Sequence, residues 1–325
     1  MAQIQGGPAI PVSVVTGGKI KGGKAIPVYG YTSPPTDGRR AAAGPARPVY
    51  VVSDAQMAAG TFQLEGGPAL PMYVSPSGLS VVGDAAQPVY VVGGSLGEAF
   101  TPASVAGLVA WYDFADAATL FTDSARTTAV AADGDAIGGV TDKSGNAKHL
   151  TGTTTTRPLY KTAIQNSKSM ALGDGVDDIL NASNFASALT ASTIFAIAKE
   201  INATQANKQF FSGKTDAARH VLGNISSTWI IFAGTVLNGS ASNTNCNLWT
   251  AKFNGASSSI QINANAETTG NAGSAALDGV RLFASSATTA WWDGYVGEVC
   301  VYNGILSAGD IALVQAYLNA KWAVY

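Results

Sequence analysis

Hydrophobic residues in the first 92 positions occur as short runs, and a closely similar phrase recurs five times, at 6–15, 22–31, 43–52, 66–75 and 83–92. In most units a glycine precedes a proline that fixes φ, and β-branched or aromatic residues follow the proline. Each unit therefore predicts one short strand that begins after its proline. A unit of this length cannot bury its own apolar face, so it needs the next repeat or another chain as a neighbour.

Equivalent positions of the repeats carry a proline and, two residues later, a tyrosine, which Ser13 replaces in the first repeat. Regularly spaced aromatic side chains suit an assembly interface. Cross-strand packing within one chain's own small sheet is nearly as good an explanation. The candidate interface residues are Pro11, Pro27, Tyr29, Pro48, Tyr50, Pro71, Tyr73, Pro88 and Tyr90.

The pattern changes near residue 100, and residues 103–306 read as an all-β domain. Short apolar or alternating segments are separated by loops of Gly, Asn, Ser and Thr, which is typical of a sandwich or barrel. Strands are predicted at 107–114, 169–172, 179–182, 193–198, 209–212, 229–233, 246–253, 258–262, 280–284 and 295–302.

One helix is predicted at the C-terminal end. Residues 307–310 form a start that resembles a capping box, with Asp in place of the usual Glu or Gln. Ile311, Val314, Leu318 and Trp322 then follow at steps of three or four residues and form one apolar stripe. The helix should pack on the sandwich edge or on a partner chain.

Composition divides the chain at the same place. Eleven of the 13 prolines precede residue 100, and all six tryptophans follow it. We therefore expect two parts: residues 1–100, a Pro/Gly-rich repeat arm for anchoring and oligomerisation, and residues 101–325, a β-domain with a conventional aromatic core.

Charge is sparse along the whole chain. Charged residues make up 12% of the sequence, with 19 Lys and Arg against 21 Asp and Glu, whereas about 25% is usual. The balance argues against nucleic acid as a partner, and so weakly charged a surface suggests a protein that packs against other chains. Short repeats with one apolar side are satisfied when identical chains wrap around an axis, so we expect a homo-oligomer, with a trimer favoured. No apolar run is long enough to span a membrane, and the first residues do not resemble a signal peptide. We expect assembly in the cytoplasm and no membrane partner.

The second part resembles a known family. Residues 107–123, the Asp-Lys-Ser-Gly-Asn loop at 142–146, the Asp-Gly-Val-Asp-Asp turn at 174–178 and the closing segment 297–322 are similar to concanavalin A-like, laminin-G-like jelly rolls of phage and bacterial surface proteins. Gly173 stands where that family usually has an aromatic residue. The resemblance implies an all-β chain, in which a repeat-bearing β arm precedes a concanavalin A-like jelly-roll sandwich with one C-terminal helix.

The Pro-Val-Tyr-Val-Val phrase resembles segments of tailed-phage virion proteins. Together, the two resemblances imply a structural protein on the virion surface, such as a head decoration or head fibre protein. Its partners would be the major capsid protein or other virion proteins. The alternative is a carbohydrate-binding receptor module of a tail fibre or spike that recognises a host glycan. A glycan-cleaving enzyme is a third and weaker reading, since one fold hosts many functions.

Hydrolytic chemistry finds little support in the sequence. Glycan cleavage needs two carboxylates about 5–10 Å apart, and no strand carries a suitable pair. Asp293 and Glu298 are five residues apart, so alternation should place them on opposite faces. His149 and His220 lack a recognisable nucleophile or a second His at ligand spacing. The chain is predicted to have no catalytic residues.

Two loops are candidates for binding a ligand or calcium. Asp174, Asp177 and Asp178 could offer oxygen ligands to Ca²⁺, although a turn in which Asp side chains bond their own backbone is favoured. Asp142 and Asn146 carry the same two interpretations. No other cofactor is expected.

Cysteine and tryptophan side chains complete the candidates. Cys246 and Cys300 have no metal spacing and are expected to be buried free thiols, with a disulfide as the alternative. Trp291 and Trp292 could stack on a sugar, but adjacent strand residues face opposite ways, so at most one can be exposed.

Overall fold

The computed structural model describes residues 100–202 and 207–325, together with the backbone of seven short strands within the first 92 residues. The chain divides into two compact units, Met1–Ala99 and Phe100–Tyr325.

The strands of the first unit follow the repeats. Strands β2 (Val12–Val15), β4 (Val28–Tyr31), β5 (Val49–Val51), β6 (Met72–Ser75) and β7 (Val89–Val92) pair in this order as one parallel sheet, and β1 (Ile4–Gln5) pairs with β3 (Ile20–Lys21). Equivalent repeat positions are in register, so Ser13, Tyr29, Tyr50, Tyr73 and Tyr90 align across the sheet. The anchoring prolines Pro11, Pro27, Pro48, Pro71 and Pro88 lie outside the described residues. The repeats thus act as each other's neighbours within one chain.

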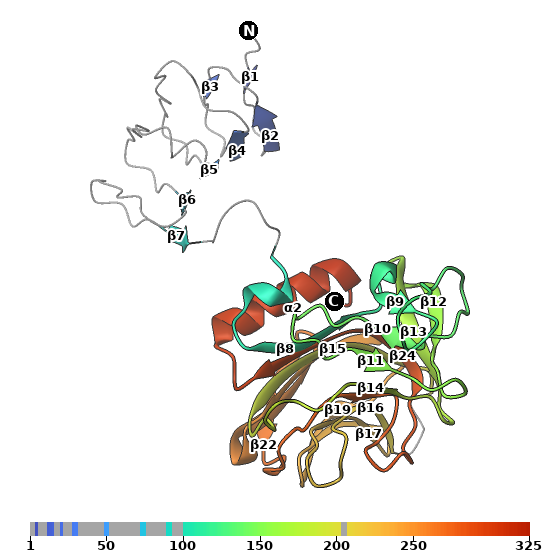
Figure 1. The fold of residues 1–325 in the computed structure, drawn as a ribbon. Helices are drawn as coiled ribbons and strands as arrows, with labels where there is room; N and C mark the ends of the chain where they lie inside the picture. The colour runs from blue at the N-terminus through green and yellow to red at the C-terminus, as the bar shows by residue number, and fades with distance from the viewer. Residues whose placement is uncertain are drawn as a thin grey trace. The chain divides into compact units, whose positions relative to one another are not determined.

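The second unit is a β-sandwich of two antiparallel sheets (Figure 1). One sheet has the order β12 (Leu159–Gln165), β13 (Lys168–Asp174), β24 (Asp293–Asn303), β15 (Ser192–Glu200), β20 (Cys246–Phe253), β21 (Ser258–Ile262) and β22 (Thr268–Gly270), and β8 (Leu108–Asp113) also pairs with β24. The other has the order β19 (Val236–Ala241), β18 (Thr228–Phe232), β17 (Val221–Ile225), β16 (Lys208–Ser212), β23 (Arg281–Leu282), β14 (Leu180–Asn181), β11 (Leu150–Thr151), β10 (Gly139–Val140) and β9 (Leu120–Phe121). Short 3₁₀ turns occur at Pro102–Ser104, Ala117–Thr119 and Gly255–Ser257. The predicted fold class is confirmed.

Aromatic side chains fill the space between the sheets. Phe210 packs edge-on against Trp249 and Trp292, with ring centroids 4.9 and 5.2 Å apart, and Trp229 lies 4.9 Å from Trp249. All four side chains are buried. Edge-to-face contacts of this kind add to the stabilisation that comes from removing apolar surface from water.

Helix α2 (Ala308–Trp322) covers the outer face of the first sheet (Figure 1). Ser307 caps its N-terminus by accepting the N–H of Asp310 at 3.1 Å. Val314, Leu318 and Trp322 are buried with Phe195 of β15, whereas Ile311 is only partly buried. The predicted helix, cap and stripe are therefore confirmed. No helix in the described part of the chain has the length and apolar content needed to cross a membrane.

A β-bulge at Gly297 changes the direction of side chains along β24. Ile197 of β15 pairs with Glu298 but the next residue pairs with Val296, so Gly297 is an extra residue. The bulge puts positions 293 and 298 on the same face, and the expectation of opposite faces is wrong. Because Gly297 is bulged, four ladder steps separate the two positions by about 13 Å along the strand, beyond the spacing of a glycosidase pair.

Gly173 is explained by its neighbours. A Cβ at this position would lie 2.6 Å from the side chain of Phe283 and from the carbonyl oxygen of Trp292. Phe283 is fully buried and occupies this space, so a larger residue at position 173 would clash.

Candidate functional sites

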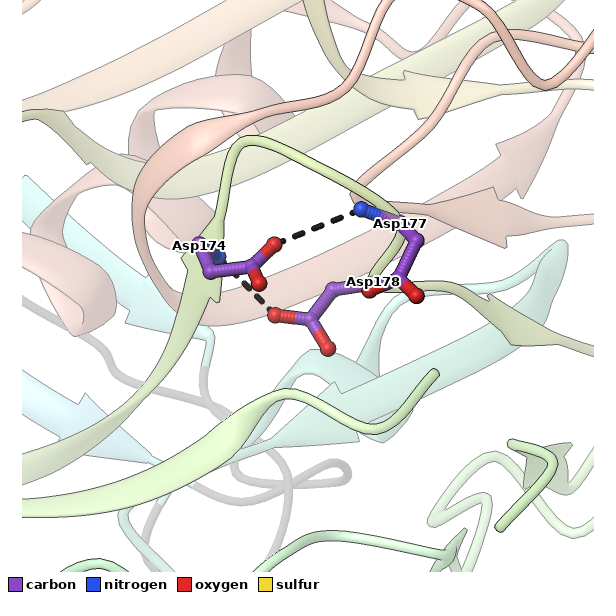
Figure 2. A group of neighbouring side chains, drawn as sticks. All are labelled: Asp174, Asp177 and Asp178. Carbon is purple, nitrogen blue, oxygen red and sulfur yellow. Dashed lines mark hydrogen bonds between the residues drawn. The ribbon is translucent and has the colours of Figure 1, made fainter. Parts of the chain in front are cut away.

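The acidic turn after β13 brings three predicted site residues together, and Figure 2 shows how they face one another. Asp174 Oδ1 accepts the N–H of Val176 at 2.8 Å and that of Asp177 at 3.4 Å, and Asp178 Oδ2 accepts the N–H of Asp174 at 2.9 Å. Gly175 has φ +76°, a conformation that glycine adopts without strain. These contacts form a self-bonded Asx turn.

The same turn concentrates negative charge. One oxygen from each of Asp174, Asp177 and Asp178 lies within 4.8 Å of the others. Burial, together with the charges of Asp174 and Asp177, raises the pKa of Asp178 to about 6. A divalent cation would relieve this repulsion, but the hydrogen bonds already account for the arrangement. Calcium binding here stays a prediction.

Asp142 organises a separate loop and is not part of that cluster. Its carboxylate accepts the N–H of Trp111 at 2.9 Å, the N–H and hydroxyl of Ser144 at 2.9 and 2.7 Å, and the N–H of Lys148 at 2.9 Å. Asn146 Nδ2 donates to the carbonyl oxygen of Leu108 at 2.9 Å. Both side chains therefore tie the 142–146 loop to β8, and a ligand role for them stays a prediction.

The structure also pairs two carboxylates that the sequence reasoning missed. Asp113 of β8 and Glu298 of β24 lie directly opposite each other in register. Lys321 Nζ bridges them, 2.6 Å from Asp113 Oδ1 and 2.8 Å from Glu298 Oε2. The pair was not predicted, because its members lie on two strands and 185 residues separate them in the sequence.

This pair is enclosed by side chains rather than open to a substrate. Glu298 is fully buried and accepts the indole N–H groups of Trp111 and Trp322, each at 2.8 Å, and the hydroxyl of Tyr317 at 3.3 Å. Burial and the charge of Asp113 raise the pKa of Glu298, whereas Lys321 and the Trp322 indole lower it. We call Asp113, Glu298, Lys321, Trp111 and Trp322 the helix network, since it fastens α2 to the sheet.

A second buried carboxylate, Glu200, ends β15. By alternation it follows Ala196 and Ala198 on the face that points between the sheets. Asn224 Nδ2 donates to its Oε1. Burial raises the pKa of Glu200 to about 7; the charge of Asp293 adds to the shift, and Asn224 and Lys208 oppose it. The sequence signal that could have identified Glu200 is its position, since it alternates with Ala196 and Ala198 on the buried face of the strand.

Both histidines have structural partners. His220 is buried, stacks on Phe253 with centroids 4.1 Å apart, and places Nε2 2.9 Å from the carbonyl oxygen of Ala275. That nitrogen must carry the proton, so Nδ1 accepts the Ser192 hydroxyl at 2.8 Å. Burial lowers the pKa of His220 to about 4, and the ring is neutral. His149 Nδ1 accepts the N–H of Asp142 at 3.1 Å.

The remaining candidates are inert or partly exposed. Cys246 and Cys300 are buried free thiols, as favoured from the sequence, and burial raises the pKa of Cys246 to about 12. Trp292 is fully buried and Trp291 is partly exposed, so only one of the two could meet a ligand.

No model of a known protein family matches the chain, and no curated protein sequence matches it. Among solved structures, it is similar to domain 4 of AbnA, a GH43 extracellular arabinanase from Geobacillus stearothermophilus, in complex with arabinotriose (13% identity, 64% of this chain and 97% of that one, TM-score 0.44). It is also similar to a GH54 α-L-arabinofuranosidase (16% identity, 57% of this chain and 51% of that one, TM-score 0.44). A third is Trypanosoma rangeli sialidase (11% identity, 67% and 33%, TM-score 0.42). The chain spans about half the length of the arabinofuranosidase and about one third of the length of the sialidase. Likeness at this level brings no activity to the chain.

Proposed function

We propose that this chain is a non-enzymatic structural protein of a phage virion, a capsid decoration or head fibre protein anchored through its N-terminal repeats. The observation that carries the proposal is the alignment of five repeats as one parallel, in-register sheet. The phage assignment itself rests on the sequence resemblances of the repeats and the jelly roll.

The sheet suggests how the anchor works. Among the described strands, β2 and β7 each pair on one side only. Neither carries a charge or a proline of the kind that natural edge strands use to prevent pairing. A virion protein, or another copy of this chain, could add a strand to either edge, and several such contacts would sum to firm attachment.

The non-enzymatic part of the proposal is supported by the helix network. One carboxylate pair in register on adjacent strands, Asp174 and Asp293, lies at the ends of β13 and β24, where Asp174 is bonded within its own turn. The other pair, Asp113 and Glu298, is buried, bridged by Lys321 and covered by α2. A substrate could reach it only if the helix left the sheet.

Incorporation into particles tests the proposal. Deleting residues 1–94 should abolish incorporation, and Val91→Lys on β7 should reduce it. Leu313→Lys, at a helix position that is 51% exposed, is the matched control and should leave incorporation unchanged. Normal occupancy by the truncated protein would refute the anchor. Release of reducing ends from host polysaccharide would refute the non-enzymatic part.

A further inference from the structure

The space between the sheets contains polar atoms without a partner among the described residues. They include Oε2 of Glu200 and the indole nitrogens of Trp229, Trp249 and Trp292, and all four residues are at most 1% exposed. Buried polar groups in native proteins are nearly always hydrogen-bonded, either to protein or to ordered water. These four atoms are three N–H donors and one carboxylate acceptor, so a molecule that can both accept and donate hydrogen bonds could satisfy them.

The free oxygen and one free donor belong to the same strand pair. Glu200 of β15 pairs with Gly294 of β24. A Cβ on Gly294 would lie 2.8 Å from Trp292 Nε1 and 3.1 Å from the Cα of Glu200. The indole nitrogen of Trp292 therefore lies over Gly294, next to the base of the Glu200 side chain.

The other side of Glu200 is fixed by the opposite sheet. Asn224 of β17 donates to Oε1, and its own Oδ1 accepts the N–H of Lys208 at 3.0 Å. Trp229 lies directly opposite Asn224 in the β17–β18 register and packs on Trp249. The three indoles and the carboxylate thus gather at one end of the interior, with Oε1 already occupied.

We propose that ordered water is bound in the sandwich interior between Glu200 Oε2 and Trp292 Nε1, in a site extended by Trp229 and Trp249. Water is the fitting ligand because one molecule can accept from an indole N–H and donate to a carboxylate oxygen. The charged groups whose fields act on Glu200 are Asp293 of β24 and Lys208 of β16. Burial is the main cause of the raised pKa of about 7, so the carboxyl exchanges its proton near neutral pH, and the bound water would sense this change.

Indole NMR of the full chain, labelled with ¹⁵N-tryptophan, tests the site with controls inside the same molecule. The indoles of Trp111 and Trp322 are also buried, but each donates to Glu298. Magnetisation transfer from water should reach the indole proton of Trp292 and be absent at Trp111 and Trp322. Trp292→Phe and Trp322→Phe identify the signals. No transfer at Trp292, or a crystal structure in which its Nε1 bonds a protein atom, would overturn the proposal.

The variant Glu200→Gln tests the contribution of the carboxyl while leaving the three tryptophans in place. In the unchanged protein the Trp292 indole signal should shift with pH, with a midpoint near the pKa of about 7. In Glu200→Gln the shift should disappear while the water contact persists, because an amide oxygen still accepts. Unchanged Trp111 and Trp322 signals would show that the variant is folded. A pH shift that survives the substitution would remove Glu200 from the site.

Discussion

Two buried glutamates on adjacent strands of one sheet face opposite sides and meet opposite surroundings. Glu298 faces α2 and accepts bonds from Trp111, Tyr317, Lys321 and Trp322. Glu200 faces the second sheet, and only Asn224 serves it among the described residues. Burial is nearly equal, at 0% and 1% exposure. Hydrogen-bond and ion-pair partners, rather than the degree of burial, therefore decide whether a buried carboxylate stabilises the fold or changes its protonation with pH.

The two glutamates also differ in the number of lysines that compensate the negative charge around them. Lys321 and Lys143 both lie within ion-pair distance of Asp113, and Lys321 also reaches Glu298. At Glu200, Lys208 is the one cation that lowers the pKa, and the charge of Asp293 opposes it. A buried charge whose partner is removed is costly, whereas a buried acid with little compensation takes up a proton instead.

The largest effect is expected from Glu298→Ala. It would leave two buried indole N–H groups without their acceptor and Lys321 with Asp113 alone. Since each unsatisfied buried donor costs about 1–3 kcal/mol, the free energy of unfolding should fall by about 2–6 kcal/mol. Denaturant unfolding of the full chain measures it. The matched control is Lys252→Ala, which breaks the partly exposed pair with Glu267 but leaves the bond from Ser259 to Glu267 in place, and it should cost less than about 1 kcal/mol. Equal losses would show that the helix network is no stronger than a surface pair.

The next effect is a pH dependence that only Glu200 should produce. Its pKa is about 7 in the folded chain against an ordinary 4.5. Because the folded value is raised, its stabilising contribution is complete below about pH 4.5 and is lost as pH rises through 7. The loss is at most about 3 kcal/mol.

Comparison with Glu200→Gln isolates this contribution. Subtracting the unfolding free energies of the variant from those of the unchanged protein cancels other titrations, including that of Asp178. The difference should fall between about pH 4.5 and pH 7.5. A difference that stays flat, or rises with pH, would contradict a raised pKa for Glu200.

A smaller effect separates two tryptophans of equal burial. Trp322→Phe and Trp292→Phe remove the same atoms from fully buried sites, but only Trp322 donates to a protein carboxylate. Trp322→Phe should therefore cost about 1–3 kcal/mol more than Trp292→Phe. Thermal unfolding of both variants measures the difference, and equal costs would mean that the bond to Glu298 adds nothing beyond packing.

Much of the fold followed from local patterns. Strands β20 and β21 have the predicted bounds because their apolar residues alternate cleanly between turn signals. Strands β12, β17 and β19 were missed, since Thr and Lys or Gly and Asn interrupt their apolar residues. Only pairing with neighbouring strands makes such segments extended.

The sites followed from sequence less well. The Asp174–Asp178 turn was visible because its residues are close along the chain. The Asp113–Glu298 pair was not, because the pairing of β8 with β24 creates it between residues that are far apart in the sequence. The face of Asp293 was predicted wrongly because the bulge at Gly297 shifts alternation by one residue. The isolated glycine within β24 was the local signal for this bulge.

The smallest effect is expected in the Asp174–Asp178 turn, where water competes for the carboxylates. Asp177→Asn removes one of three neighbouring charges and keeps the backbone N–H that donates to Asp174. If the turn is held by its own hydrogen bonds, relief of repulsion should stabilise the chain by about 0.5 kcal/mol at pH 7. The same variant should melt alike in calcium chloride and in a chelator. If the three carboxylates instead hold Ca²⁺, calcium should raise the melting temperature of the unchanged protein, and Asp177→Asn should reduce that rise. In calcium buffer, Asp177→Asn should therefore raise the melting temperature if the turn is self-bonded and lower it if the turn is a cation site.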